Sequence, residues 1–506
     1  MVDVVESKAI KTEPEDPRVR NDDTDNPTLY ARRAAKLDSR VEIRRHPKRG
    51  RGLFALGNIP AGTEVMRVPA AGAVSRQGHG SCSGCLLSAN TVGPLQPCHG
   101  CSLSFCASCK IAGTARGAKG VGIIAIVHSG PMCELTKEFF GICATSRGGA
   151  GPSHDSLRLL ADVVVKRKAG IIDDEEWALL ISLESDDNEA GSMSLTRPEL
   201  ESCVKLFKRL LGIDISQEDV QTMYRRQAAA ITRNVHTVAP NVMVMDGGPV
   251  QGLFPCGALT NHSCRPNMFF HCMAEPSPSV DGPPAIKQVF RTVCDIKAGD
   301  ELCYSYISSS FAARSVVERR SLLEGWGFRC GCERCKTEVA ERRRVKKDPT
   351  PMNENARRII DNLRRVPRLC QWGNTSALKK ETWMPLLNEA MHFCLRGTNE
   401  HVSWVLLDDL ALALSEATEL VGVLDLLFRF EVCGHVANVL SKFHQPAAIT
   451  FFYQQYTFST KIRASGLGTS QQNSLKVYEA AGRQSRSNAE ELQKLFYGKK
   501  GTRQSI

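Results

Sequence analysis

The sequence contains no long apolar run. Within its 506 residues no stretch of about 18 consecutive apolar residues occurs, so we expect no helix that spans a membrane. The first 25 residues are polar and acidic and contain no apolar segment like that of a secretory signal peptide. On these grounds we expect no membrane partner. We also expect a location in the cytoplasm and the nucleus.

One cysteine cluster lacks a ligand. Cys330, Cys332 and Cys335 form a C-x-C-x-x-C pattern with only three thiols, whereas structural zinc takes four tetrahedral ligands. Cys264 is a single cysteine that follows an Asn-His pair, and it can supply the fourth thiolate. The sequence therefore predicts a zinc ion that pins a later segment onto a polar pocket.

Composition places the chain among ordinary globular proteins. Apolar residues make up 42% and charged residues 24%, and the length suffices for about two to four domains. The formal net charge of +11 is compatible with weak binding to nucleic acid or chromatin, and equally with simple solubility. Twenty cysteines in a chain without an export signal indicate metal ligands, catalytic groups or buried thiols rather than disulfides.

A Cys-rich segment at residues 82–133 offers eight ligands in short pairs, enough for two tetrahedral zinc sites. We expect interleaved pairing, in which one ion is held by Cys82, Cys85, Cys106 and Cys109 and the other by Cys98, Cys101, His128 and Cys133. Metal binding would then supply the folding energy of a segment too small for its own core. The alternative is that these groups bind no metal, and it applies most to His128 and Cys133, which a long Gly-rich spacer separates from the other pairs.

The remaining segments alternate between strand and helix patterns. Residues 1–39 are polar and Pro-containing and are expected to be disordered. Strand patterns occur near residues 49–68, 268–293 and 295–302, and helical patterns near 156–235 and 352–497. The basic run at 341–348 could be a nuclear-import signal or a solvated linker helix, and the sequence leaves both open.

This order of parts resembles the SMYD family of SET- and MYND-domain lysine methyltransferases. The resemblance is strong over residues 41–335 and rests on six motifs: Gly50-Arg51-Gly52-Leu53, Asp155-Ser156-Leu157-Arg158-Leu159-Leu160, Gly252-Leu253-Phe254-Pro255, Asn261-His262-Ser263-Cys264, Gly299-Asp300-Glu301-Leu302 with Tyr306, and the C-x-C-x-x-C cluster. The Cys-rich segment departs from the family pattern in the spacing of its third and fourth ligand pairs and has no Trp in its link.

The resemblance implies an α+β fold in which a split SET domain carries insertions. The expected parts are a disordered tail at 1–39, the first SET part at 40–75, a MYND zinc finger at 80–135, a helical insert at 150–235, the SET core at 236–310, a post-SET zinc cluster at 311–340, a basic linker at 341–351 and a helical C-terminal domain at 352–506. The C-terminal helices resemble TPR hairpins, although no 34-residue period is visible.

The resemblance also implies S-adenosylmethionine as methyl donor, with three structural zinc ions. The residues it assigns to the donor are Gly50, Arg51, Gly52, Asn234, Asn261, His262 and Phe328. Tyr306 takes the position of the catalytic tyrosine, and Tyr304 lies two residues earlier on the same strand face, in the substrate channel. A tyrosine at position 304 favours the addition of a single methyl group. Asn234 and Phe328 each also fit a purely structural role.

We therefore expect a monomeric protein-lysine N-methyltransferase that acts on histone or other protein lysines. A rival interpretation is a catalytically weak SET/MYND adaptor that binds a peptide partner through its zinc finger. Nucleic-acid binding through the basic runs near Arg44 and Arg342 is a third interpretation and is compatible with either.

Overall fold

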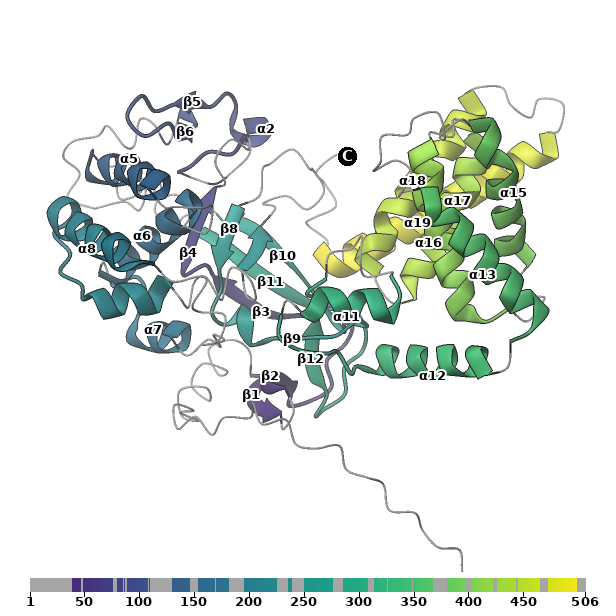
Figure 1. Cartoon of the computed structure of the whole chain (residues 1–506), viewed down its shortest axis with the longest axis horizontal. Coiled ribbons are helices and arrows are strands. Elements are labelled where there is room, and N and C mark those ends of the chain that lie inside the picture. The colour runs from purple at the N-terminus through teal and green to yellow at the C-terminus, as the bar shows by residue number, and fades with distance from the viewer. Residues whose placement is uncertain are drawn as a thin grey trace, which may run out of the picture.

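A computed structural model of the chain describes most residues between 39 and 497 (Figure 1). The described residues are 39–46, 49–75, 80–84, 86, 89–107, 109, 130–145, 153–168, 170–181, 195–224, 235–238, 250–275, 285–307, 314–324, 326–347, 349–366, 380–396, 402–421, 426–442, 445–464 and 472–497. The tail expected at 1–39 lies almost wholly outside this set.

The strands are β1 (Val41–His46), β2 (Gly50–Ala55), β3 (Glu64–Pro69), β4 (Gly72–Ser75), β5 (Gln96–Pro97), β6 (Ser104–Phe105), β7 (Val235–Val238), β8 (Val250–Leu253), β9 (Asn261–His262), β10 (Met268–Glu275), β11 (Ala285–Thr292) and β12 (Glu301–Tyr304). The helices of the first half are α2 (Ala89–Val92), α5 (Gly130–Thr145), α6 (His154–Lys168), α7 (Asp174–Ile181), α8 (Arg197–Leu211) and the 3-10 turn η2 (Gly257–Leu259). Those of the second half are α11 (Val316–Glu324), α12 (Glu333–Lys347), α13 (Pro351–Leu363), α15 (Lys380–Arg396), α16 (Trp404–Val421), α17 (Leu426–Ser441), α18 (Gln445–Ala464) and α19 (Gln472–Tyr497).

Three small sheets occupy the centre of the molecule, between two groups of helices (Figure 1). Their strand orders are β1-β2-β12-β9, β10-β11-β3 and β4-β8-β7. Each sheet joins one or two strands from before residue 76 to two strands from after residue 234, so the sheet domain is split in sequence and continuous in space. Its core is lined by buried aliphatic side chains such as Leu53, Val65 and Leu302, together with Phe290 and Tyr304.

The helices α5 to α8 form one lobe with its own apolar core, packed against β4. The sequence signals of α8 explain its limits. Pro198 lies in the first turn, Glu199 accepts the backbone N–H of Thr196 at 2.6 Å, and Gly212 ends the helix in the left-handed region at φ 66°. The lobe is tied to the sheet by Asp162, which accepts the backbone N–H of Ala73 at 2.9 Å.

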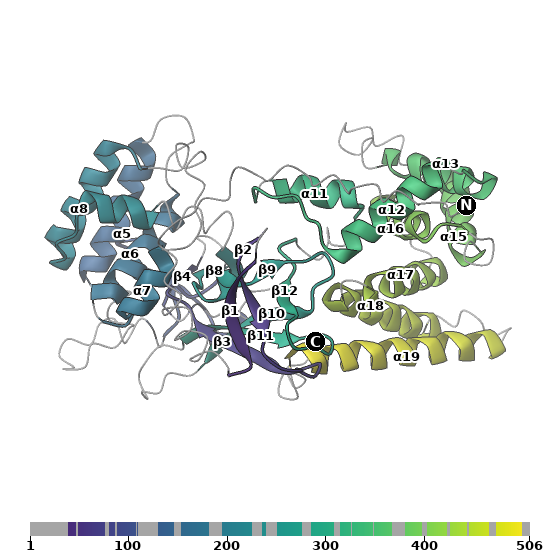
Figure 2. The ribbon, with the colours of Figure 1, turned by 90° about the horizontal axis from the view of Figure 1, so that it is seen from below.

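The helices α13 to α19 form a second lobe with a large apolar core. The last helix, α19, extends from this lobe back to the sheet domain, where it contacts β10 and β11 (Figure 2). Leu492 and Leu495 of α19 and Phe269 of β10 pack against the same core. The C-terminal helices are therefore joined to the sheet domain by an apolar contact at the end of α19.

The basic run is helical over its described residues. The helix α12 begins at Glu333, inside the cysteine cluster, and continues to Lys347, so it crosses the boundary that we expected at residue 340. Within it Arg342 pairs with Glu338 and Asp409, and Arg344 pairs with Glu341. Of the two interpretations of this run, the structure shows a helix, and two of its arginines form ion pairs. The nuclear-import interpretation stays a prediction.

Within the described residues, none of the helices combines the length and the apolar character that crossing a bilayer requires.

Candidate active site and metal-binding clusters

The glycine segment of β2 lies directly against the Asn-His pair. A Cβ atom added at Gly52 would come within 2.9 Å of Asn261 Nδ2 and of Glu301 Oε1, so a larger residue would displace these two side-chain ends. Gly50 opens the strand with a positive φ of 72°, which also favours glycine. Three of the residues assigned to the donor, Gly50, Gly52 and Asn261, thus meet at one end of the sheet.

The orientation of the Asn261 amide is fixed by two acceptors. Its Nδ2 donates to the carbonyl oxygen of Arg51 at 3.0 Å and to Glu301 Oε1 at 2.7 Å. Because both neighbours can only accept, the amide nitrogen has to face them and the amide oxygen has to face the other way. Glu301 is itself paired with Arg49 Nη1 at 2.7 Å. Asn261 therefore presents a hydrogen-bond acceptor on the side opposite to Glu301.

His262 uses both ring nitrogens inside the chain. Its Nδ1 accepts the backbone N–H of Tyr306 at 3.0 Å, so Nε2 carries the proton and lies 3.3 Å from Cys264 Sγ. Burial lowers the pKa of His262 to about 3, and the ring is neutral at physiological pH. The imidazole thus holds the surrounding chain in place. A contact between residue 262 and a donor would have to come from its backbone.

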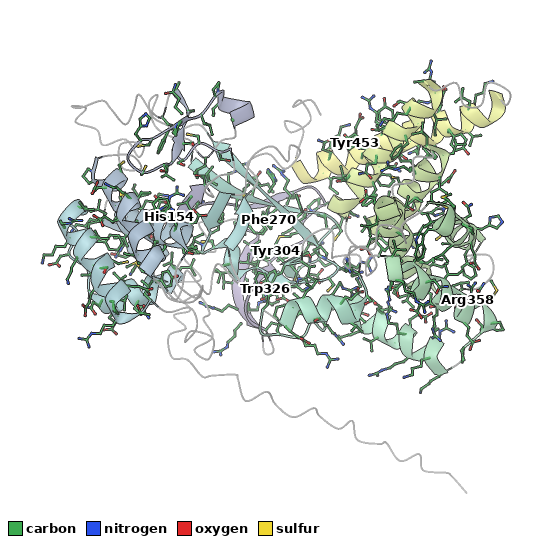
Figure 3. All side chains as sticks on the ribbon, turned by 45° about the horizontal axis from the view of Figure 1, so that its top comes forward. His154, Phe270, Tyr304, Trp326, Arg358 and Tyr453 are labelled. Carbon is green, nitrogen blue, oxygen red and sulfur yellow. The ribbon has the colours of Figure 1, made fainter. Side chains whose placement is uncertain are left out.

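Tyr306 stands in a cluster of aromatic rings. Its hydroxyl donates to the carbonyl oxygen of Thr260 at 2.8 Å, and its ring centroid lies 4.9 Å from that of Tyr304 and 4.7 Å from that of Trp326. Figure 3 shows Tyr304 and Trp326 close together in the middle of the molecule. The bond to Thr260 uses the hydroxyl hydrogen of Tyr306, so any further hydrogen bond to this hydroxyl has to be accepted by its oxygen.

Tyr304 closes the inner side of this cluster. It is 3% exposed and meets Phe270 and Phe290 edge-on at centroid distances of 5.2 and 5.8 Å. Burial, and then the neighbouring Tyr306, raise the pKa of Tyr304 well above its ordinary value, so it stays a neutral phenol. Sequence reasoning missed Trp326 and Phe270. The only signal for Trp326 was its place two residues before Phe328.

Phe328 lies at the solvent-exposed edge of the same aromatic cluster. Its ring is 5.9 Å from that of His262 and 6.2 Å from that of Tyr306, yet 36% of the residue remains exposed. A large ring left partly exposed beside polar groups has an open surface on which a flat ligand can stack. Asn234, the remaining residue assigned to the donor, lies outside the described residues.

Four cysteines meet on the other side of His262. The sulfur atoms of Cys264, Cys330, Cys332 and Cys335 all lie within 4.8 Å of one another, and all four residues are buried. The Cys264 sulfur is 3.9 Å from that of Cys330 and 3.6 Å from that of Cys335. Four sulfurs at about 2.3 Å from a tetrahedral zinc ion would be about 3.8 Å apart, and a disulfide would need about 2.05 Å. The donor set fits zinc.

Two further cysteine groups lie in the Cys-rich segment and at the start of α5. One consists of Cys82, Cys106 and Cys109, and the other of Cys98, Cys101 and Cys133. A Cβ atom at Gly100 would lie 2.8 Å from Cys133 Sγ, so a larger residue at this position would displace the Cys133 sulfur. The spacing pattern assigned the same cysteines to each site. Their predicted fourth ligands, Cys85 and His128, lie outside the described residues.

The glycine segment, the Asn-His-Ser-Cys turn and the tyrosine strand are the parts that the comparison with known families recognises. The profile described as "SET domain" matches residues 50–307, which run from the first glycine to the residue after Tyr306. This match covers half of the chain, and the chain belongs to the SET domain family.

Shorter parts of the chain are similar to curated proteins that are named as histone-lysine methyltransferases. The chain is 35% identical over 129 residues to "Histone-lysine N-methyltransferase SET5" of Meyerozyma guilliermondii, which is 25% of this chain and 24% of that protein. It is 34% identical over 92 residues to "Histone-lysine N-methyltransferase ASHR2" of Arabidopsis thaliana, 18% of this chain and 21% of that one. It is 29% identical over 190 residues to "Histone-lysine N-methyltransferase SMYD3" of Mus musculus, 36% and 40% of the two chains. The chain thus spans less than half the length of each of these relatives.

Proposed function

We propose that this protein is an S-adenosylmethionine-dependent protein-lysine N-methyltransferase of the SMYD type. The observation that carries the proposal is that Asn261, which lies against Gly52, directly precedes His262, whose ring contacts both Tyr306 and the partly exposed ring of Phe328. The match to the SET domain family and three relatives named as histone-lysine methyltransferases support it.

The methyl donor would be held by the backbone of the glycine segment, the side-chain amide of Asn261 and the ring of Phe328. Bound S-adenosylmethionine supplies a methyl group on a positively charged sulfur. Gly50 and Gly52 allow the backbone to approach the ligand, and the Asn261 oxygen offers an acceptor to an ammonium group. Phe328 offers its open ring to an adenine, a stacking contact worth roughly 1–3 kcal/mol.

The acceptor lysine has to be uncharged before its nitrogen can take a methyl group. A free lysine has a pKa near 10.4, so deprotonation at pH 7 costs about 4–5 kcal/mol. The rings of Tyr304, Tyr306 and Trp326, which contact one another through Tyr306, would form an apolar lining in which the neutral amine is less disfavoured than in water. Most of the remaining rate gain would come from holding the amine in line.

Tyr306 would orient the reacting groups through its hydroxyl oxygen, because its hydrogen is directed to Thr260. Tyr304 is packed between Phe270 and Phe290 and narrows the space next to it. A narrow site leaves little room for an amine that already carries methyl groups. We therefore propose monomethylation as the main reaction.

The metal sites would have a structural role. Three zinc ions, one in each cysteine group, would hold a post-SET segment and a MYND-type finger, while the C-terminal helices would form a TPR-like domain. The hairpin β5-β6 lies at the outer end of the molecule, away from β9 and β12 (Figure 1). This position suits a module that binds a peptide partner, and a histone or another lysine-bearing protein would be the substrate.

The experiment is transfer of a radiolabelled methyl group from S-adenosylmethionine to a total cell lysate, read first as gel bands and then by mass spectrometry. Tyr306→Phe is the matched control. It removes one hydroxyl that binds a backbone carbonyl, at a stability cost of about 1 kcal/mol, and it should reduce labelling at least about 100-fold. Equal labelling by the wild type and the variant would reject the proposed role of Tyr306. No labelling of lysine by the wild type would reject the activity.

A second experiment tests whether the zinc finger is needed for donor binding. A variant that lacks residues 82–133 should keep donor affinity, measured by calorimetry, because these residues lie between two SET segments. Loss of donor affinity in the folded deletion variant would place the finger in the active site.

A further inference from the structure

Arg319 of α11 is the largest fully buried side chain in the described part of the protein, with 0% exposure. Its guanidinium Nη2 donates to Cys335 Sγ at 3.5 Å and to Glu338 Oε2 at 2.9 Å, and Nη1 donates to the carbonyl oxygen of Arg314. Burying a charge is costly unless its partners compensate for lost water. One of the partners here is a sulfur of the four-cysteine group.

The charge of that group explains why a buried arginine is favourable there. Four thiolates around one zinc ion leave a net charge of −2 in a buried place. A guanidinium beside one sulfur offsets part of this charge and donates a charge-assisted hydrogen bond to it. Two further arginines face the same group through backbone atoms, since Arg334 donates to the Cys264 carbonyl at 3.0 Å and Arg320 to the Cys330 carbonyl at 3.1 Å.

A chain of ion pairs continues from Arg319 into the C-terminal helices. Glu338, 3% exposed, binds Arg319 with one oxygen and Arg342 Nε with the other at 2.9 Å. Arg342 forms a two-pronged pair with Asp409 of α16, at 3.0 and 2.9 Å. Asp409 is 6% exposed. Alternating charges therefore connect a ligand sulfur with the second helical lobe through α11 and α12, which contact each other, and α12 in turn contacts α16. In Figure 1, α12 lies below the C-terminal helices.

We infer that Arg319 is a positioning residue of the four-cysteine metal site, and that the pairs Arg319–Glu338, Glu338–Arg342 and Arg342–Asp409 anchor this site to the C-terminal helical lobe. Retention of the metal beside the SET pocket then depends on a carboxylate of α16. The inference is independent of the proposed methyl transfer, because it concerns metal binding alone.

The test is the rate at which zinc leaves the full-length protein in excess 4-(2-pyridylazo)resorcinol, followed by the absorbance of the zinc complex. Cys264→Ser identifies which kinetic phase belongs to the four-cysteine site, and the two other cysteine groups are internal references. The main variant combines Arg319→Met with Glu338→Gln, so that both charges of this buried ion pair disappear together, while Arg342 keeps its pair with Asp409. Zinc should leave the four-cysteine site of this double variant about 10–100 times faster than that of the wild type, the usual effect of losing a hydrogen-bond partner of a metal ligand.

Arg320→Met is the matched control, because Arg320 lies on the same helix and donates to a ligand carbonyl rather than to a sulfur. Zinc release from the control should stay within about threefold of wild type, below the range expected for a lost ligand partner. Wild-type release by the double variant would overturn the inference. Equal acceleration by Arg320→Met would assign the effect to helix α11 in general and would also overturn it.

A second variant covers failure of the double variant to fold. Arg319→Lys keeps the charge but not the planar fork that reaches Cys335 and Glu338 together, and it should also release this zinc faster. Wild-type release by a folded Arg319→Lys would contradict the inference.

The anchoring part has its own test. Asp409→Asn removes the far end of the chain of ion pairs without touching α11, and it should accelerate release from the same site by about two- to thirtyfold, the usual range of coupling through packed elements. Asp361→Asn, an exposed position on α13, should have no effect. Unchanged release in Asp409→Asn would overturn the anchoring.

Discussion

His262 accepts the backbone N–H of Tyr306 on one ring nitrogen and lies within hydrogen-bond distance of the Cys264 sulfur on the other. A single buried imidazole therefore connects the tyrosine segment with a cysteine of the four-sulfur group. Because Phe328 lies 5.9 Å from the same imidazole, the metal site and the proposed donor pocket share one wall. A substitution that disrupts the metal site should therefore also weaken donor binding.

The first prediction is that Cys264→Ser loses one zinc ion and weakens donor binding together. A serine hydroxyl stays protonated and is a poor zinc ligand, so three thiolates remain. The segment around residues 325–340 should become sensitive to protease, and donor affinity should fall by at least the stacking contribution of roughly 1–3 kcal/mol. Zinc analysis by mass spectrometry and calorimetry with S-adenosylhomocysteine measure the two effects.

The control for this variant is Cys203→Ser, which changes another buried cysteine in the core of the α5–α8 lobe. It should cost stability without loss of zinc. Full zinc content and full donor affinity in Cys264→Ser would show that the cysteine group and the pocket are not coupled.

The second prediction concerns Glu301, which orients Asn261. Glu301→Ala should free the amide to rotate and should weaken binding of S-adenosylhomocysteine about tenfold, consistent with the loss of a hydrogen bond to a charged group. Glu301→Gln keeps an acceptor for Asn261 and should change affinity much less. Equal losses in both variants would assign the effect to the charge of Glu301 and its pair with Arg49 rather than to the amide.

The third prediction is a count of metal ions. Purified protein should contain close to three zinc ions, because the chain offers three groups of ligands. Removing them with a strong chelator should unfold the Cys-rich segment, which is too small for a core of its own. Two ions per chain would show that the group with Cys98, Cys101 and Cys133 forms no site.

The fourth prediction is a pH dependence that arises from Asp408 of α16. Asp408 is 8% exposed, and burial raises its pKa to about 6, although Lys442 and Arg334 act in the opposite direction and Asp409 adds to the rise. A carboxyl with a raised folded-state pKa favours folding most below its unfolded value near 3.8. This contribution is lost as pH rises through about 6, by up to about 3 kcal/mol.

Asp408→Asn should therefore make the protein more stable than wild type at pH 8 and nearly equal to it at pH 4, measured by urea unfolding. Asp361→Asn on the exposed side of α13 should show no such difference. A variant that is less stable than wild type at both pH values would mean that the pair with Lys442, at 3.6 Å, outweighs the cost of burial.

The local sequence pattern was sufficient to predict those site residues whose role depends only on residue type and spacing. The missing fourth thiol pointed to Cys264, and the structure brings it to Cys330, Cys332 and Cys335. The mixed sheet and helix content of a SET domain was expected from the same motifs and is confirmed. These features could be predicted because only a few residue types, at particular spacings, can form a metal site or a glycine turn.

Roles that arise from distant contacts could not be predicted. The sequence pattern predicts only that Glu301 lies in a strand. Its hydrogen bonds are to Arg49, 252 residues away in sequence, and to Asn261, 40 residues away. Arg319 reads as one of several surface arginines, yet it is fully buried. The pattern of α19 predicts that one face is covered but not that its end covers β10 and β11.

The split sheet also sets an order of events during synthesis. Strand β2 pairs with β12, and Arg49 just before β2 reaches Glu301, 252 residues later. At about 5–20 residues per second a ribosome needs roughly 13–50 s to produce the second partner after the first. During that time β1, β2 and β3 present unpaired edges, while the lobe α5 to α8 can already close its own core. We expect newly made chains to need protection from aggregation in this interval, and folding to be slow for a protein of this size, because its sheets consist of contacts distant in sequence.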